Sequence, residues 1–267
     1  MFDQFALGVF YPVESFLHRL RARTKLLALG WLIGYVSVAN QLGRVAPYAV
    51  LVALALLAAL LSGVGLGHVW RRMRLLVLLT VLGTLPAVLL LESDGAPLAA
   101  LGPLVITWAA LWLGLRLIVV FLALYALALL LTMTTSPVGL IEGLTLLLGP
   151  LRRLRLPVDA FALMALLALR FIPTLADEIE LLVKAQLARG ADFTHGSLRE
   201  RSNSAAALLV PVYQGALRRA AELADALDAR GYTIAQAPTV LHERPLAAAD
   251  YLTLAVVMML TLGTLLI

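Results

Sequence analysis

Cysteine is absent from this chain of 267 residues, and charged residues are scarce. Without cysteine the chain can form neither disulfides nor thiolate metal sites. Charged residues make up 14% of the sequence and hydrophobic residues 62%, whereas soluble domains contain about 25% and about 45–50% of them. This composition excludes an ordinary soluble domain and predicts a protein that crosses the membrane several times.

Sequence patterns of catalysis and of metal or nucleotide binding are missing as well. The Gly-rich stretch GVGLG (63–67) follows an apolar run and lacks the Lys-Ser/Thr pair of a phosphate-binding loop, so we interpret it as a loop between spans. No nucleophile elbow or paired carboxylates occur. The histidines have no spacing typical of metal ligands: His18, His68, His195 and His242. We therefore predict that the chain is not an enzyme and holds no metal or cofactor of its own.

The N-terminal segment and the net charge bear on two further possibilities, a cleavable signal peptide and nucleic-acid binding. Residues 1–25 contain charged side chains but no apolar core of a signal sequence, so we expect no cleavable signal peptide. The net charge is +5, but Lys and Arg of a membrane protein collect in its cytoplasmic loops. Nucleic-acid binding is therefore not expected.

Five apolar runs come close to the length of a membrane span, which is about 20 residues. They cover 26–41, 46–63, 75–91, 117–134 and 250–267, and a sixth, less marked run covers 157–172. In lipid, every backbone polar group must find its partner within the segment, so uniformly apolar runs form helices. The predicted fold class is an all-α polytopic membrane protein with about five transmembrane helices.

The placement of charge orients these spans. Basic residues precede the first span in HRLRARTK (18–25) and the third span in RRMR (71–74), whereas LESDGAP (91–97) carries only acidic residues. Because Lys and Arg mark cytoplasmic loops, we predict a cytoplasmic N-terminus and place the 92–103 loop outside the cell.

The apolar segment 104–116 is too long to continue directly into the span that follows it. Trp108 and Trp112 are four residues apart, as expected for an aromatic belt at the membrane interface. Arg116 can extend from the start of the next helix to the headgroups. We interpret all three as interface anchors; the alternative is that Arg116 faces a translocation path, since charges within the membrane are often functional.

The segment 135–245 has a different composition, with 12 of the 21 Lys and Arg residues. We place it on the cytoplasmic side and predict long helices, because apolar residues recur at helical spacing. Pro173 and Pro211 are expected to kink or delimit these helices. The predicted domains are 1–134 with transmembrane helices, 135–245 in the cytoplasm, and 246–267 with the last transmembrane helix.

Two copies of Ala-Arg-Gly end charged helical runs within this segment: Ala188, Arg189, Gly190 and Ala229, Arg230, Gly231. A glycine after the last helical residue adopts the left-handed conformation that ends a helix, and a cation there is favoured by the helix dipole. Both copies extend to Ala-x-x-Ala-Arg-Gly, which places a small residue beside the arginine on matching faces. Small residues allow a partner to approach the backbone, and a guanidinium offers five donors to a carboxylate. The repeated motif therefore fits docking onto another protein better than capping alone.

Together, these motifs resemble the transmembrane T component of energy-coupling factor (ECF) transporters. SFLHRLRARTKLL (15–27) is similar to the N-terminal signature of that family, TTSP (134–137) to its motif after a span, and RFIPTL (170–175) to the start of its first long cytoplasmic helix. The two Ala-Arg-Gly motifs resemble the pair that docks onto the ATPases. The chain has Arg-Ala-Arg at 21–23 where many members have Asp-Pro-Arg. Its N-terminal signature looks more like that of shared T components than of dedicated cobalt or nickel types.

The resemblance implies an energy-coupling subunit in the cell membrane, with long cytoplasmic coupling helices. Two separate ATPase subunits would bind the ATP, with Ala188, Arg189 and Gly190 on one of them and Ala229, Arg230 and Gly231 on the other. A membrane S component would bind the substrate, a vitamin or a metal. Apolar faces at 138–149 and 205–217 are predicted to hold the S component or, equally, to pack against the other coupling helix or the membrane surface.

Two other functions are compatible with the residues alone. A stand-alone secondary transporter or channel would have ionisable groups at the bilayer midplane or broken helices in repeated halves. The predicted spans offer only Arg116 and Asp250, and the latter lies in a terminal turn. A membrane scaffold without a role in transport is the second alternative.

Overall fold

The computed structural model describes residues 15–42, 44–90, 97–101, 104–190, 198–233 and 247–266. These residues form two compact units. The bundle unit contains the described residues of 15–147 together with 247–266, and the crossed-helix unit contains those of 148–233. The predicted domain boundaries at 134/135 and 245/246 refer to the sides of the membrane and stay a prediction.

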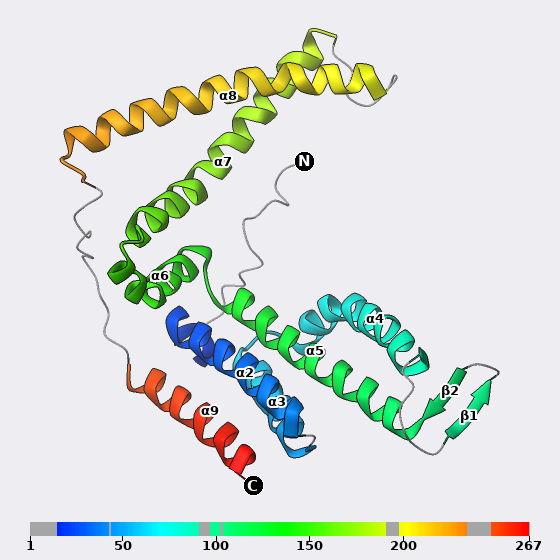
Figure 1. Cartoon of the computed structure of the whole chain (residues 1–267). Helices are drawn as coiled ribbons and strands as arrows, with labels where there is room; N and C mark the ends of the chain where they lie inside the picture. Colours follow the sequence, from blue (N-terminus) through cyan, green and yellow to red (C-terminus); the bar gives the residue numbers. More distant parts are fainter. Residues whose placement is uncertain are drawn as a thin grey trace. The chain divides into compact units, whose positions relative to one another are not determined.

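Helices dominate both units (Figure 1). The bundle unit comprises α1 (Phe16–Arg19), α2 (Ala22–Leu42), α3 (Ala46–Leu61), α4 (Leu66–Leu90), β1 (Pro97–Leu101), β2 (Leu104–Thr107), α5 (Trp108–Thr134), α6 (Pro137–Leu147) and α9 (Ala248–Leu266). The crossed-helix unit comprises the 3₁₀ helix η1 (Gly149–Leu154), α7 (Val158–Ala188) and α8 (Leu198–Ala229).

The predicted all-α membrane fold is confirmed. Among the described residues, three helices are long and apolar enough to cross a membrane: α5, α7 and α9. The predicted spans 26–41 and 117–134 lie within α2 and α5, and the less marked run at 157–172 forms the first half of α7. That helix continues to Ala188, so the apolar run and the charged run after it are one element.

One short hairpin, which the sequence analysis did not predict, interrupts the helical architecture between α4 and α5. Strands β1 and β2 pair antiparallel, with Leu101 opposite Leu104. The second strand is a run of β-branched residues, Val105 to Thr107, which favour extended backbone. Thr107 then accepts the backbone N–H of Ala110 at 3.3 Å, so α5 begins with a side-chain cap at Trp108.

The core of the bundle unit lies between α2, α3 and α5. Leu32 and Tyr35 of α2 pack against Leu51 and Leu54 of α3, and Ala123 of α5 completes the cluster. A second cluster joins the end of α3 and the start of α4 to α5: Ala59, Val64, Val69, Leu130 and Met133. The turn between α3 and α4 contains Gly63 at φ 65°, which confirms the loop predicted there.

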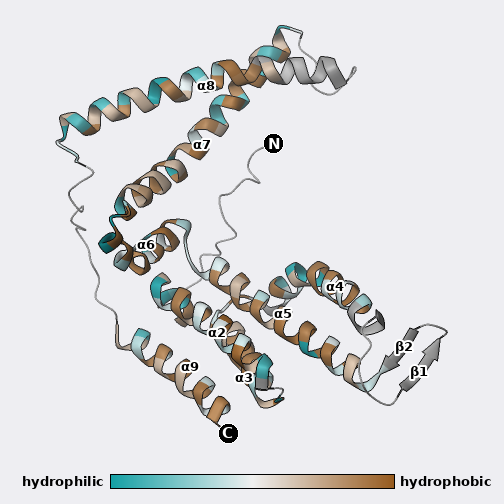
Figure 2. Cartoon of the chain, in the orientation of Figure 1, coloured by the Kyte–Doolittle hydropathy of each residue, from teal (hydrophilic) through white to brown (hydrophobic). Residues whose placement is uncertain are grey.

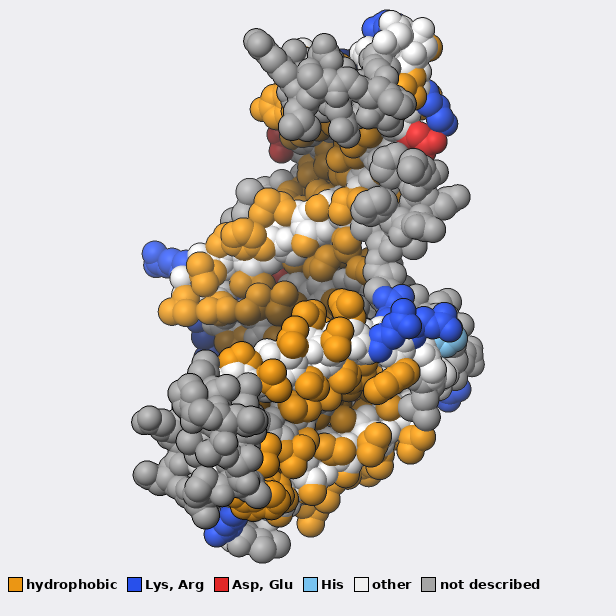
Figure 3. Space-filling view, turned by 90° about the vertical axis from the view of Figure 1, so that its right-hand side faces the viewer, with side chains coloured by type: hydrophobic (Ala, Val, Ile, Leu, Met, Phe, Trp, Pro, Cys, Tyr) orange, Lys and Arg blue, Asp and Glu red, His pale blue; other side chains and the backbone are white. Residues whose placement is uncertain are grey.

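Apolar side chains also cover the outside of the molecule. Figure 3 shows hydrophobic side chains over most of the described surface in that view, with Lys and Arg in a few clusters. Figure 2 shows that α5 is apolar along most of its length, whereas α8 is more polar toward its C-terminal end. An apolar exterior is what helices that face lipid present.

In the crossed-helix unit, α7 and α8 contact each other where they cross (Figure 1). Gly215 of α8 lies against Glu178 of α7: a Cβ on this glycine would be 2.8 Å from Glu178 Oε1. Arg219, one turn further along α8, forms an ion pair with Glu178. Pro173 and Pro211 were predicted to kink or delimit the helices; both lie inside α7 and α8, so neither delimits its helix, and a kink stays a prediction.

Candidate functional site

The first Ala-Arg-Gly copy ends α7. Ala188 is the last helical residue and Arg189 follows as the C-cap. Gly190 has φ 87°, a left-handed conformation that other residues adopt only with strain. Its backbone N–H donates to the carbonyl oxygen of Leu187 at 3.0 Å. The glycine thereby turns the chain out of the helix directly after the arginine.

The second copy ends α8 and also has a left-handed glycine after the arginine. Ala229 is the last helical residue, and Gly231 has φ 71°. The N–H of Gly231 donates to Asp228 O at 2.9 Å and that of Tyr232 to Leu227 O at 3.0 Å. This pair of hydrogen bonds is a Schellman motif, which satisfies carbonyl groups that the helix end leaves open. The predicted helix caps are therefore present in both copies.

Both arginines are exposed beyond these caps. Neither Arg189 nor Arg230 forms an ion pair within the described part of the chain, and Ala188 and Ala229 beside them are exposed as well. A cation at the C-terminal end of a helix lies in the favourable field of the helix dipole. Each helix end thus presents one guanidinium next to a small side chain and open backbone.

The crossing of α7 and α8 separates the two arginines. At a rise of 1.5 Å per residue, Arg189 lies about 16 Å along α7 from Glu178, and Arg230 lies about 22 Å along α8 from Gly215. Figure 1 shows the C-terminal ends of the two helices on opposite sides of the crossing. The two copies therefore lie at separate positions on one unit.

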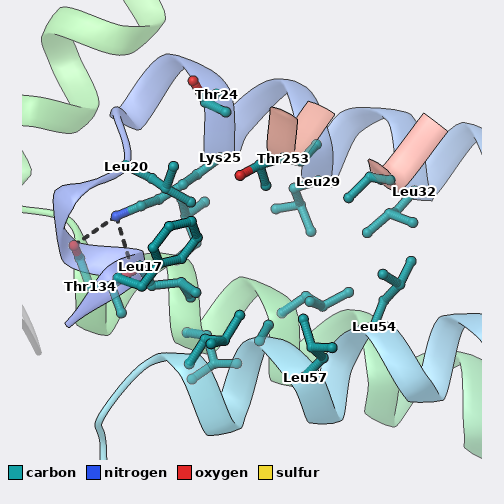
Figure 4. Close-up of a pocket in the computed structure, with 18 residues that line it drawn as sticks. Leu17, Leu20, Thr24, Lys25, Leu29, Leu32, Leu54, Leu57, Thr134 and Thr253 are labelled. Atoms are coloured by element: carbon teal, nitrogen blue, oxygen red, sulfur yellow. Dashed lines mark hydrogen bonds between the residues drawn. The ribbon is translucent and has the colours of Figure 1, made fainter. Parts of the chain in front are cut away.

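Two of the other three motifs, 15–27 and 134–137, meet in the bundle unit, and the third, 170–175, lies within α7. Lys25 Nζ donates to the carbonyl oxygen of Thr134 at 2.9 Å and to its hydroxyl at 3.2 Å (Figure 4). It also donates to Thr135 Oγ1 at 3.0 Å. Ser136 accepts the N–H of Gly139 at 3.1 Å and so caps α6. The TTSP motif thus ends α5, binds Lys25 and starts α6.

A buried carboxylate of α9, the last helix, hydrogen-bonds to the residues around the start of α2. Asp250, 2% exposed in the first turn of α9, accepts the N–H of Arg21 at 3.1 Å and the hydroxyl of Thr24 at 2.9 Å through Oδ1. Its Oδ2 accepts the N–H of Ala247 at 3.0 Å, which caps α9. We call this network the N-terminal clasp: Arg21, Thr24, Lys25, Thr134, Thr135 and Asp250.

The helix α6 lies close to the clasp. A Cβ on Gly143 would lie 2.9 Å from both Ala22 Cβ and Arg23 N, so only glycine allows this approach of α6 to α2. Local sequence patterns do not predict these contacts between helices, because the partners are more than 100 residues apart along the chain. The sequence features that could have indicated the clasp are a lysine among apolar residues, two adjacent threonines, and an acidic residue in the first turn of a helix.

An apolar cavity of about 130 Å³ lies beside the clasp. Figure 4 shows leucines of α1, α2 and α3 pointing into it, among them Leu17, Leu29 and Leu57. Lys25 lies at one end, where all three of its protons are donated to the two threonines. The walls of this cavity therefore offer apolar contact and no open charge. Within the described residues, no group of three or more His, Asp or Glu could hold a metal ion.

The three predicted interface anchors lie at the start of α5. The rings of Trp108 and Trp112 are perpendicular, with their centroids 6.4 Å apart. The guanidinium carbon of Arg116 lies 5.7 Å from the ring centroid of Tyr48 on α3, a distance at which a cation is attracted to the ring face. Arg116 therefore links α5 to α3, and its position relative to the headgroups stays a prediction.

Comparisons with known proteins agree with these motifs. The family model described as cobalt transport protein matches residues 13–239. The energy-coupling factor transporter transmembrane protein EcfT of Heliobacterium modesticaldum is 39% identical over 251 residues, 94% of this chain and 92% of the relative. EcfT of Bacillus subtilis is 36% identical over 232 residues, which cover 87% and 86% of the two chains.

A third relative extends the similarity to nearly the whole length. EcfT of Thermosediminibacter oceani is 34% identical over 262 residues, 98% of this chain and 97% of the relative. The matched region includes the clasp, the crossing of α7 and α8 and both capped helix ends. The chain belongs to the family of transmembrane T components of energy-coupling factor transporters.

Proposed function

We propose that this chain passes the ATP-driven motion of two ATPase subunits to a substrate-binding membrane S component, for uptake of a vitamin or a metal. Family membership makes it the energy-coupling membrane component of a transporter complex. The observation that carries the finer proposal is the pair of exposed arginines, each followed by a left-handed glycine, at the ends of two crossing helices. Two separated docking points of the same construction fit two subunits of the same class.

The chemistry of docking follows from the helix ends. Each guanidinium enters a groove on one ATPase and donates to a carboxylate there, while Ala188 or Ala229 lets the groove wall approach the helix. Removing one member of such a desolvated, hydrogen-bonded charge pair costs about 2–5 kcal/mol. ATP is bound by these partner subunits, and this chain contributes no cofactor.

The crossing gives the motion a pivot. When the ATPases close or open, Arg189 and Arg230 move relative to each other, and the helices turn about their contact. Gly215 keeps the helices close enough for the Glu178–Arg219 ion pair. The motion then continues into the membrane helices and reorients the S component.

The S component binds to exposed apolar faces of α6 and α8 in this proposal. Side chains on the predicted faces at 138–149 and 205–217 are exposed: Val138, Leu144, Leu146, Leu148, Leu209, Val210, Tyr213 and Leu217. Exposed contiguous apolar side chains mark protein or membrane contacts. Packing against the membrane surface is the competing use of these faces.

The proposed location is the cell membrane, with the N-terminus and the crossed-helix unit in the cytoplasm. Support comes from the positive-inside rule, because the basic residues around the start of α2, those near the start of α4 and those of 135–245 would then share one side. The cytoplasm is also where ATP is available to the partner subunits. The N-terminal signature favours a T component that is shared among several S components.

The test is the double variant Arg189→Ala with Arg230→Ala, expressed with the ATPases and an S component. We expect the variant to insert into the membrane but to lose copurification of the ATPases and substrate uptake. Lys184→Ala is the matched control, since this exposed cation of α7 pairs with Glu180 of its own helix at 2.8 Å. Assembly and uptake at the wild-type level in the double variant would show the docking proposal to be wrong.

A further inference from the structure

Three arginines are concentrated in the short turn that precedes α7. The arginine turn, residues 148–157, contains η1 and carries Arg152, Arg153 and Arg155. No acidic residue occurs between Glu142 and Asp159. None of these arginines belongs to the docking motifs or to the helix crossing.

Only one of the three charges is compensated nearby. Arg152 Nη2 lies 2.6 Å from Asp159 Oδ1, in the first turn of α7. Arg153 and Arg155 are exposed and form no ion pair within the described residues. The turn therefore presents two open guanidinium groups.

Exposed leucines alternate with these arginines. Leu154 is 71% exposed and Leu156 is 47% exposed. Arg155 lies between them with φ 60°, and its backbone N–H donates to Arg152 O at 3.0 Å. This left-handed residue ends η1 and fixes the turn, which keeps both leucines at the surface. Basic and apolar side chains thus share one short surface.

The helix after the turn is apolar and exposed as well. α7 is long and apolar enough to cross a membrane, and Phe161 and Met164 near its start are 59% and 54% exposed. In membrane proteins, Lys and Arg at the end of an apolar helix meet the headgroup layer. The anionic lipids of the cytoplasmic leaflet attract each such cation.

We propose that the arginine turn binds the headgroups of anionic phospholipids, with Arg153 and Arg155 on the phosphates and Leu154 and Leu156 in the acyl boundary. This contact fixes the start of α7 at the membrane surface. Exposed arginines without ion pairs, interleaved with leucines, are suited to binding an anionic membrane surface. The inference needs only the membrane location of the chain and does not depend on docking of the ATPases.

The absence of cysteine makes a direct test simple. Leu154→Cys in the full chain carries a single nitroxide label, and the protein is placed in nanodiscs of phosphatidylcholine alone or with an equal part of phosphatidylglycerol. We expect oxygen dissolved in lipid to reach the label more readily, and an aqueous nickel chelate less readily, when phosphatidylglycerol is present. Adding Arg153→Gln and Arg155→Gln should lower the inserted population by about fivefold per arginine, the equivalent of ~1 kcal/mol each.

Two further variants separate lipid binding from a general effect. Arg153→Lys with Arg155→Lys keeps the charge and should preserve the lipid response, which excludes misfolding as its cause. A label at Leu181→Cys, on an exposed site of α7 away from the turn, should not respond to phosphatidylglycerol. An equal response there would overturn the assignment to the turn.

Two results at position 154 would contradict the proposal. In the first, oxygen and the nickel chelate reach the label equally well in both lipid compositions, and the glutamine variant gives the same accessibility. The second is shielding from both reagents that requires the partner subunits and occurs equally without phosphatidylglycerol. That second result would make the arginine turn a protein contact and show the lipid proposal to be wrong.

Discussion

Residues of the sequence motifs form the two capped helix ends and, together with Asp250, the N-terminal clasp, but the polar groups of the two regions have opposite fates. In the clasp, Lys25 and Asp250 find all their partners inside the chain. At the helix ends, only the backbone is satisfied, while Arg189 and Arg230 stay exposed. A motif whose polar groups are hydrogen-bonded within the chain stabilises the fold. A motif whose polar side chains remain exposed is suited to binding a partner.

The clasp should show the largest loss of stability. Asp250→Ala leaves the Thr24 hydroxyl and the N–H groups of Arg21 and Ala247 without their acceptor. An unsatisfied buried donor costs about 1–3 kcal/mol, so we expect a loss of about 3 kcal/mol in the free energy of unfolding in detergent.

Asp250→Asn keeps one acceptor oxygen and should lose about half as much. Asp225→Ala, at an exposed site of α8, is the control and should stay within about 0.5 kcal/mol of the wild type. If Asp250→Ala were as stable as this control, the clasp would not be a stabilising network.

The close contact of α6 should show an intermediate loss. Gly143→Ala places a methyl group 2.9 Å from Arg23 N, and backbone cannot move aside easily. Overpacking of this kind costs about 1–3 kcal/mol. Gly34→Ala in α2 is the matched control, because nothing lies within 4 Å of its Cβ. This control should be neutral or gain up to about 1 kcal/mol from helix propensity, as thermal unfolding would measure.

The helix ends should show the smallest change in stability. Arg189→Ala and Arg230→Ala each remove an exposed side chain that lacks an ion pair within the described residues. We expect a change of no more than about 0.5 kcal/mol in the free energy of unfolding. A loss as large as that of Asp250→Ala would mean that the arginines stabilise the fold, which would remove the contrast between the two regions.

Local features of this fold were predictable from the sequence, and long-range ones were not. Apolar length identified the helices, and Gly190 and Gly231 identified the ends of α7 and α8, because both signals act within a few residues. The hairpin was missed because Val105 and Ile106 are as apolar as a span, so hydropathy alone cannot distinguish strand from helix there. The clasp was missed because Lys25 and Thr134 are 109 positions apart, and no periodicity reports which helix ends meet.

The two prolines and Arg116 show a second limit of predicting structure from sequence. Pro173 and Pro211 are strong helix breakers by propensity, yet both lie inside long helices. Arg116 was interpreted from its distance to a predicted membrane boundary, whereas its observed partner, Tyr48, is on another helix. For Arg116 the contact is with another element, and sequence spacing within one element does not contain that information.

The central claim is that two equivalent helix ends hold two ATPases, and the mass of the intact complex tests it most directly. Native mass measurement of the purified wild-type complex should give two ATPase subunits per chain. Arg189→Ala or Arg230→Ala alone should leave one ATPase, and the double variant none. Retention of both ATPases in the double variant would contradict the account.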